Sequence, residues 1–267
     1  MRAKPSIGSQ PIMSYVDLHC HLLPGLDDGA ETMADAVAHA RRLHAQGVRD
    51  VACTSHIKRA DFPGVVIEQL AALVVATQRA IAADGLAVRL HAGGELAHAD
   101  ALVLGHDELE AIALGPPGAR WLLLECPFEG VGDAFVAAAD RITRFGYGLL
   151  IAHPERSPGL LEGDGLERLE PLLRQGALLQ VNVCSLLGNH GLDIQDLALE
   201  LVRTGLAYCL ASDGHPGHRE HTLQLGFHLL IRAGASGVQA YRLTQSNPRF
   251  LLQQGVRSLE PPVARAA

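Results

Sequence analysis

The stretch YVDLHCHLLPGLDDGA, residues 15–30, joins a short apolar run to a dense group of histidine and aspartate side chains. The run Tyr15–His19 has the length of a strand, and side chains alternate along an extended chain, so we expect His19 and His21 to point to the same side. Asp27 and Asp28 follow in the next turn. Imidazoles and carboxylates grouped in this way indicate a metal site at the end of a strand.

Six more apolar runs of strand length follow, separated by amphipathic segments. They are 50–54, 87–93, 121–125, 148–152, 177–181 and 207–211. Most are apolar without alternation, which is typical of a parallel sheet covered on both faces. Helical spacing of apolar residues occurs over 67–81, 135–145, 194–201 and 223–230, and Thr32 with Asp35 resembles a capping box opening a helix that ends near Gly47. Seven strand–helix units predict an α/β barrel, closed or nearly closed; an open doubly wound sheet is the alternative.

Each apolar run ends in, or is followed closely by, a potential metal ligand. After the first run these are His56, Glu95, Glu125, His153, Asn182, Asp213 and His215. The ligand site of α/β barrels and open sheets lies at the carboxyl ends of the strands, so we expect these side chains to converge. One histidine at a strand end is a weak signal, and the repetition along the chain carries the prediction.

The chemistry of these side chains favours a hydrolase. Histidine and carboxylate ligands suit Zn, Mn or Fe. Two such ions about 3.5–4 Å apart position the attacking and leaving oxygens and lower the pKa of bound water towards about 7. The pattern therefore predicts a metal-bound hydroxide as the nucleophile of an in-line displacement, and our hypothesis for the mechanism is that this hydroxide bridges two metals and attacks phosphorus. The sequence contains no GxGxxG or GxxxxGK[ST] fingerprint of a dinucleotide or nucleoside triphosphate site.

Composition narrows the class of protein. The chain has 267 residues, of which 48% are hydrophobic and 19% charged, and this balance suits one large folded domain. A net charge of -7 disfavours a nucleic-acid partner, and no apolar run is long enough to span a bilayer. Five scattered cysteines without a CxxC pair are typical of reduced thiols in the cytoplasm. We expect residues 1–14 to be a disordered leader, 15–255 a single barrel domain and 256–267 a solvated tail.

The polar strand ends lie in six short motifs. These are DLHCHLLPGLDDGA (17–30), TSHIK (54–58), GGEL (93–96), LLECP (123–127), IAHPER (151–156) and ASDGH (211–215). Together they resemble the PHP (polymerase and histidinol phosphatase) superfamily, and within it the CpsB/CapC/YwqE-type bacterial protein-tyrosine phosphatases of capsule and exopolysaccharide synthesis. The resemblance implies a distorted (β/α)7 TIM-like barrel, the PHP fold.

The resemblance also implies three divalent ions, Mn, Fe or Zn, and a set of ligands. Carried over by motif, the first ion takes His19, His21, Glu95 and Asp213; the second shares Glu95 and adds Glu125 and His153; the third takes Asp28, His56 and His215. Arg156 is expected to bind the phosphate, and Arg219 is a second phosphate contact. The implied substrate is a phosphotyrosine protein, namely the tyrosine-rich tail of an autophosphorylating kinase of polysaccharide synthesis.

Departures from the family pattern keep alternatives open. Ile57 stands where members often carry a second histidine, and the loop 58–64, which we expect to shape the substrate mouth, is short. One alternative is a PHP phosphoesterase for a small molecule, histidinol phosphate or a sugar phosphate. A metal-stabilised binding module is the non-enzyme alternative, although no predicted ligand is missing.

A second phosphatase signature occurs in the same region. Cys53 and Arg59 have the Cys-x5-Arg spacing of the cysteine-dependent tyrosine phosphatases, in which the thiolate attacks phosphate. The intervening loop has no glycine that would let its backbone turn inward, and Cys53 lies within an apolar run. A packed thiol is therefore the expected role of Cys53.

Overall fold

The computed structural model describes residues 13–157, 159–160 and 163–256 of the chain. All strand pairs among these residues are parallel, as the apolar runs predicted. The strands are β1 (Tyr15–Cys20), β2 (Val48–Cys53), β3 (His56–Ile57), β4 (Arg89–Ala92), β5 (Glu95–Leu96), β6 (Trp121–Glu125), β7 (Gly148–Ala152), β8 (Leu178–Asn182) and β9 (Ala207–Ala211). Each of the seven predicted runs overlaps one of the longer strands.

Two of the predicted strands are interrupted. The hydrogen-bonded order is β1-β2-β4 in one sheet and β3-β5-β6-β7-β8-β9 in the other, so β3 and β5 resume the paths of β2 and β4. The second break falls at Gly93 and Gly94, where a Cβ atom would lie 2.9 Å from Leu114 and 2.7 Å from Ile57. A larger residue at either position would require these side chains to move, and the chain resumes pairing at Glu95, which lies opposite His56.

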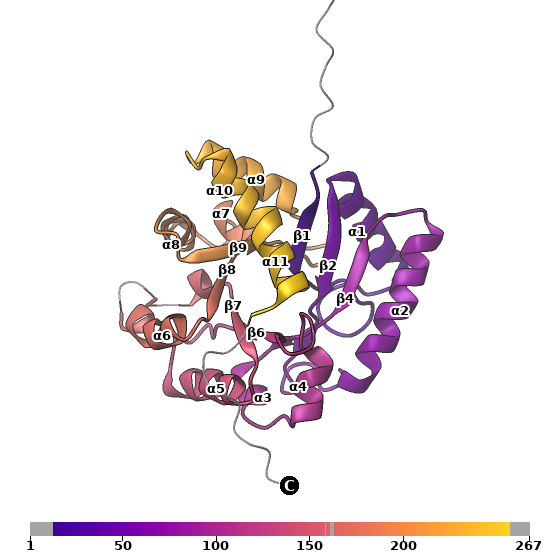
Figure 1. The fold of residues 1–267 in the computed structure, drawn as a ribbon. Helices are drawn as coiled ribbons and strands as arrows, with labels where there is room; N and C mark the ends of the chain where they lie inside the picture. The colour runs from indigo at the N-terminus through magenta and orange to yellow at the C-terminus, as the bar shows by residue number, and fades with distance from the viewer. Residues whose placement is uncertain (1–12, 158, 161–162, 257–267) are drawn as a thin grey trace, which may run out of the picture.

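The strands lie in chain order around a ring, with helices outside it (Figure 1). The ladder between β9 and β1 is not continuous, but Cys20 forms a parallel bridge with Gly214. The Asp213 amide donates to the His19 carbonyl at 2.9 Å, and the His21 amide donates to the Gly214 carbonyl at 2.8 Å. The ring is thus joined at the carboxyl ends of its first and last strands, as a distorted (β/α)7 barrel requires.

The helices include one over each stretch where apolar spacing predicted one, and others that the spacing did not predict. They are α1 (Met33–Ala45), α2 (Ile67–Ala83), α3 (His98–Ala101), α4 (His106–Ile112), α5 (Asp133–Arg144), α6 (Gly165–Arg174), α7 (Val183–Leu186), α8 (Leu192–Arg203), α9 (Leu223–Arg232), α10 (Gly237–Tyr241) and α11 (Asn247–Gln254), with a 3-10 turn at Pro154–Arg156 and a π-helical turn at Arg242–Ser246. Thr32 and Asp35 form the expected capping box of α1.

Two separate cores hold the barrel together. The larger core packs the outer helices against the strands. The smaller one draws on strands around the ring and on α11, through residues such as Val16, Leu123, Leu150 and Leu251. The indole Nε1 of Trp121, at the first residue of β6, donates to the Leu251 carbonyl at 3.1 Å. Helix α11 therefore closes the end of the barrel where the strands begin (Figure 1), which leaves the opposite end for function.

The chain segments beside the barrel are partly described. Ser14, the last residue of the expected leader, is bound by Gln245 and Arg249. Val256, the first residue of the expected tail, donates its amide to the Ala119 carbonyl. The rest of both segments, 1–12 and 257–267, lies outside the described residues. No helix of the described ranges is both long and apolar enough to cross a membrane.

Candidate metal centre

The nine predicted ligands converge at the carboxyl ends of the strands. Among the described residues, four groups of side chains have ligand atoms within 4.8 Å of one another: His21 with Asp28, His56 and His215; His19 with His153 and Asp213; His19 with His21 and Glu95; and His56 with Glu95 and Glu125. These groups contain all nine predicted ligands and no other described residue. They place His153 with His19 and Asp213 rather than with Glu125, and how the ions share the ligands stays a prediction.

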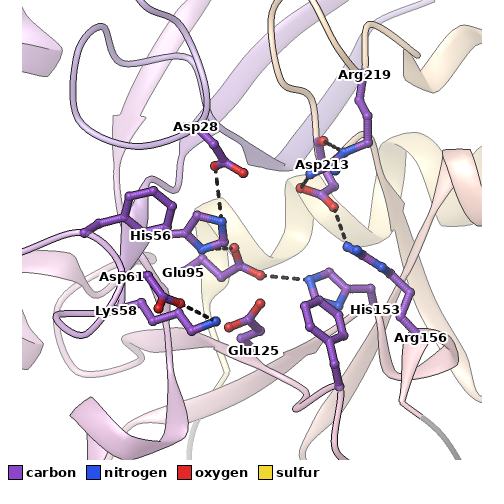
Figure 2. Close-up of a pocket in the computed structure, with 12 residues that line it drawn as sticks. Asp28, His56, Lys58, Asp61, Glu95, Glu125, His153, Arg156, Asp213 and Arg219 are labelled. Atoms are coloured by element: carbon purple, nitrogen blue, oxygen red, sulfur yellow. Dashed lines mark hydrogen bonds and ion pairs between the residues drawn. The ribbon is translucent and has the colours of Figure 1, made fainter.

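Glu95 lies at the centre of these groups. It opens β5, is 1% exposed, and has His56 and His153 on either side (Figure 2). Its Oε1 is 2.8 Å from His153 Nε2, and its Oε2 is 2.9 Å from His56 Nδ1. The same Oε2 lies 3.3 Å from the Nε2 atoms of both His19 and His21. A carboxylate with histidine nitrogens near both of its oxygens could contribute one oxygen to each of two metal ions.

The rings of His19 and His21 are oriented by hydrogen bonds on their far nitrogens. His19 Nδ1 donates to Gln180 Oε1 at 3.0 Å, and His21 Nδ1 donates to Asp27 Oδ2 at 2.9 Å. In neutral imidazole the other nitrogen then carries a lone pair. The two Nε2 atoms lie only 3.2 Å apart, so when both rings are neutral their lone pairs face the same buried gap. A shared cation removes that repulsion, and the donor set therefore fits a divalent metal.

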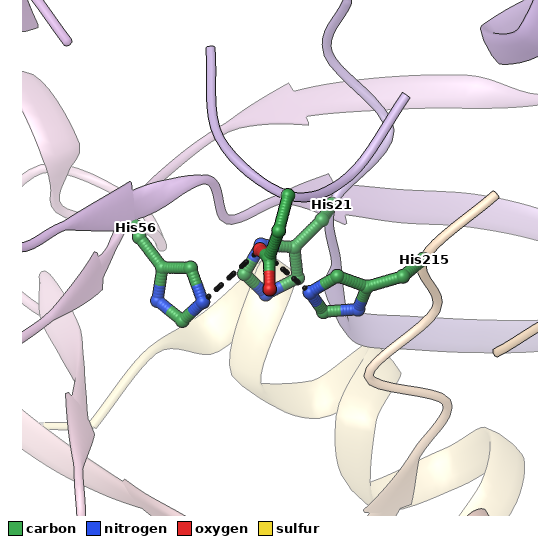
Figure 3. Close-up of side chains that lie close together, drawn as sticks. His21, His56 and His215 are labelled. Carbon is green, nitrogen blue, oxygen red and sulfur yellow. Dashed lines mark hydrogen bonds and ion pairs between the residues drawn. The ribbon is translucent and has the colours of Figure 1, made fainter. Parts of the chain in front are cut away.

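A second group of ligands lies toward the mouth of the site. Asp28 Oδ1, on the loop after β1, is 3.0 Å from His215 Nε2 and 3.4 Å from His56 Nε2. The rings of His21, His56 and His215 are gathered around this carboxylate (Figure 3). His215 Nδ1 lies 2.9 Å from the Asp213 carbonyl, which orients its Nε2 into the site. This group consists of the three ligands that were predicted for the third ion, together with His21.

Three polar residues form a chain of hydrogen bonds that reaches two of the predicted ligands, and the sequence did not predict this chain. Asn182 Nδ2 donates to Asp213 Oδ2 at 2.8 Å, and Gln180 Nε2 donates to Asn182 Oδ1 at 2.7 Å. The Asn182 amide in turn donates to Glu155 Oε1 at 2.9 Å. Asn182, predicted as a potential ligand, instead holds a ligand. Together with the Gln180–His19 bond, this chain fixes two ligands from one strand, β8.

The electrostatics of the site favour positive charge at its centre. Burial and the neighbouring Glu95 carboxylate raise the pKa of Glu125 to about 7. Burial alone would raise the pKa of Asp213 as well, but His19 and Arg219 hold it well below its usual range. Burial lowers the pKa of His21, yet its contacts with Asp27 and Glu95 outweigh this and raise it to about 9. Buried carboxylates of this kind require a balancing cation.

Both predicted arginines reach this centre. Arg156 Nη1 donates to Asp213 Oδ2 at 3.2 Å, and Arg219 Nη2 donates to Asp213 Oδ1 at 3.2 Å. They line one side of a pocket of about 220 Å³ whose floor includes Glu95 and Glu125 (Figure 2). Two guanidinium groups beside a ligand cluster can bind two oxygens of a phosphoryl group.

The Cys-x5-Arg spacing does not form a site. Cys53 is fully buried in the helix-facing core, and burial raises the pKa of its thiol well above the usual range. Arg59 pairs instead with Glu108. Neither side chain lines the pocket, which agrees with the sequence-based expectation of a packed thiol.

Comparison with known proteins places this geometry in a family. A solved structure of the metal-dependent tyrosine phosphatases YwqE from Bacillus subtilis and CpsB from Streptococcus pneumoniae is similar over 94% of this chain and 100% of that chain, with a TM-score of 0.74 and 27% identity. Histidinol phosphate phosphatase from Lactococcus lactis shares the fold alone, with a TM-score of 0.51 and 13% identity over 84% of this chain and 95% of that chain.

The sequence comparisons agree with the structural one. Tyrosine-protein phosphatase YwqE of Bacillus subtilis is 30% identical over 254 residues, which are 92% of this chain and 95% of the relative. The family described as "Capsular polysaccharide synthesis, CpsB/CapC" matches residues 15–253. The chain therefore belongs to the CpsB/CapC family.

Proposed function

We propose that the protein is a metal-dependent protein-tyrosine phosphatase. The observation that carries this proposal is the pair of Nε2 atoms of His19 and His21, 3.2 Å apart and each 3.3 Å from Glu95 Oε2. Glu95 in turn lines a pocket together with Arg156 and Arg219. Membership of the CpsB/CapC family supports the reaction class, since a relative that is similar over almost the whole chain is named a tyrosine-protein phosphatase.

The side chains of the site are proposed to have two roles, binding metal ions and binding the phosphoryl group. The nine ligands are proposed to hold three ions of Mn, Fe or Zn. When bound, such ions supply charge neutralisation and a water of lowered pKa. Arg156 and Arg219 are proposed to bind the phosphoryl oxygens, because their guanidinium groups reach the same pocket from the segments after β7 and β9. A phenolate leaving group, with a conjugate acid of pKa about 10, demands little protonation.

The finer parts of the proposal concern biological setting. We propose a single catalytic domain over 15–255, a location in the cytoplasm and, as substrate, the phosphorylated tyrosine-rich tail of a kinase of polysaccharide synthesis. The family description supports the link to capsular polysaccharide. Five free and buried cysteines suit a reducing compartment.

The test is an assay of p-nitrophenyl phosphate and a phosphotyrosine peptide on purified protein, with EDTA in one arm and iodoacetamide in the other. We expect EDTA to abolish turnover, Mn²⁺ to restore it and iodoacetamide to leave it unchanged. Loss with iodoacetamide alone would overturn the metal mechanism. Histidinol phosphate and sugar phosphates belong in the same panel, because faster turnover of either would favour a small-molecule phosphoesterase.

Glu95→Ala is the variant that tests the centre itself. Glu95 contacts four of the five ligand histidines, so its removal should release metal and lower turnover by at least about 1000-fold. Metal content by elemental analysis and turnover are measured on the same preparation. Full activity in this variant would refute the central role of Glu95.

A further inference from the structure

The walls of the pocket contain two phenylalanines among charged and polar side chains. The lining consists of Asp28, His56, Lys58, Asp61, Phe62, Glu95, Glu125, Phe128, His153, Arg156, Asp213 and Arg219. Phe62 and Phe128 are its only members without a polar side-chain atom. Phe128 is 41% exposed. Part of its ring is therefore open to a ligand that enters the pocket.

The two rings lie on opposite sides of the site. Phe62 stacks on His56, with ring centroids 5.0 Å apart and planes inclined by 2°. Phe128 stacks on His153, at 5.8 Å and 18°. His56 and His153 contact different oxygens of Glu95 and flank it (Figure 2). The rings thus stand beyond the two histidines, with the floor of the pocket between them.

Both rings are held in place by their own segments. In the loop after β3, the amides of Asp61 and Phe62 donate to the Lys58 carbonyl at 3.0 and 2.8 Å, and Lys58 Nζ pairs with Asp61 at 2.8 Å. In the turn after β6, the Pro127 carbonyl beside Phe128 accepts a hydrogen bond from Ser157 Oγ at 2.8 Å. Rings on loops fixed in this way lose little freedom when a ligand binds.

Phe128 also lies against a phosphate-binding candidate. The guanidinium carbon of Arg156 is 4.5 Å from the centroid of the Phe128 ring. A phosphoryl group bound by Arg156 would lie near the Phe128 ring, within a pocket that Phe62 also lines. The ring of an aryl ester can contact these aromatic faces, whereas a short alkyl ester offers no ring to stack on them.

We propose that Phe62 and Phe128 form an aromatic clamp that selects aryl phosphates over alkyl phosphates. The inference rests on the proposed tyrosine phosphatase function and assigns its selectivity to two residues. Aromatic pairs contribute beyond the area they bury, so each ring is expected to change affinity for an aryl ligand about 2- to 12-fold.

The test compares binding of phenylphosphonate and methylphosphonate to the metal-loaded protein by calorimetry. Neither ligand is hydrolysed, so leaving-group reactivity does not enter. We expect the unaltered protein to bind phenylphosphonate more tightly, and Phe62→Ala and Phe128→Ala each to weaken that ligand while methylphosphonate changes less than about twofold. Phe62→Tyr and Phe128→Tyr should retain the preference. The matched control is Phe250→Ala, because Phe250 is 52% exposed on α11 at the other end of the barrel.

Two results would overturn the clamp. One is an unchanged preference for phenylphosphonate in the double variant of Phe62 and Phe128. The other is an equal loss for both phosphonates in Phe128→Ala, because Phe128 would then only position Arg156. Failure of the unaltered protein to hydrolyse a phosphotyrosine peptide would instead refute the proposed function, and the phosphonate comparison would still report on the two rings.

Discussion

Replacing Asn182 with alanine tests whether the polar chain on β8 governs metal affinity. The substitution removes one hydrogen bond donated to the carboxylate of Asp213, at 2.8 Å, and one accepted from Gln180, at 2.7 Å. A hydrogen bond to a charged group contributes about 1.5–3 kcal/mol. Partners of metal ligands usually change metal affinity about 10- to 100-fold when removed. Both estimates agree on a loss near 30-fold in affinity for the ion that Asp213 is proposed to bind.

The assay is a titration of metal-free protein with Mn²⁺ or Zn²⁺ against a competing chelator at fixed pH. Turnover at saturating metal is measured alongside, and we expect it to recover most of its value because every ligand is still present. Gln78→Ala is the matched control. The Gln78 side chain also donates one hydrogen bond and accepts one, to the Val88 carbonyl and from the Leu90 amide, but both lie beside β4 and away from the ligands.

Metal affinity within twofold of the unaltered protein in Asn182→Ala would refute the reasoning, provided that the variant unfolds cooperatively. An equal loss in Gln78→Ala would refute it too, because the effect would then come from general destabilisation. A loss in Asn182→Ala alone would show that β8 positions ligands that belong to other strands.

Three further changes probe the parts around the centre. Cys53→Ala should leave turnover within about twofold, since the thiol is buried away from the pocket; a 100-fold loss of turnover would contradict this. Gly29→Ala should weaken metal binding, because its Cβ would overlap the carbonyl of His21 and lie 2.6 Å from its Cβ, and metal titration checks it. Burial, aided by Arg42, lowers the pKa of His39 to about 4. As the pH falls below about 6.5, this histidine therefore takes up a proton in the unfolded state but not in the folded state. The free energy of unfolding should consequently decrease by about 2 kcal/mol between pH 7 and 5. Urea unfolding at both pH values should show a smaller loss in His39→Leu, and equal losses would exclude this histidine.

Most of the predicted ligands could be identified because they lie near or soon after the end of one of the longer strands. His153 and Asp213 come directly or almost directly after β7 and β9, and a parallel barrel brings such positions to one end whatever the details of packing. The apolar runs also predicted both ends of β7 and of β9 correctly, because nearly every side chain of these two strands is buried and the runs are therefore continuous. A local pattern that repeats along the chain therefore predicts which residues, far apart in sequence, come together in the fold.

The partners of the ligands could not be predicted in this way. Gln180 contacts His19 across 161 positions of sequence, and a glutamine within an apolar strand has no periodicity that reports its partner. The breaks after β2 and β4 were also missed, because the close approach of Gly94 to Ile57 exists only once the strands are paired. Phe62 and Phe128 carried no signal either, since turn residues follow no spacing. These hydrogen-bond partners, strand breaks and ring positions depend on contacts between distant segments, and no local pattern in one sequence reports such contacts.

Backbone strain is concentrated at the ligands. Among the described residues, His153 and Asp213 are the only non-glycine residues with positive φ, at 35° and 48°. This left-handed conformation costs an L-residue about 1–2 kcal/mol. The barrel holds both residues there, because the His153 amide donates to the Gln180 carbonyl at 2.8 Å and the Asp213 amide donates to the His19 carbonyl at 2.9 Å. Contacts with neighbouring strands thus offset the strain and hold the backbone of these two predicted ligands in the left-handed region at the barrel end.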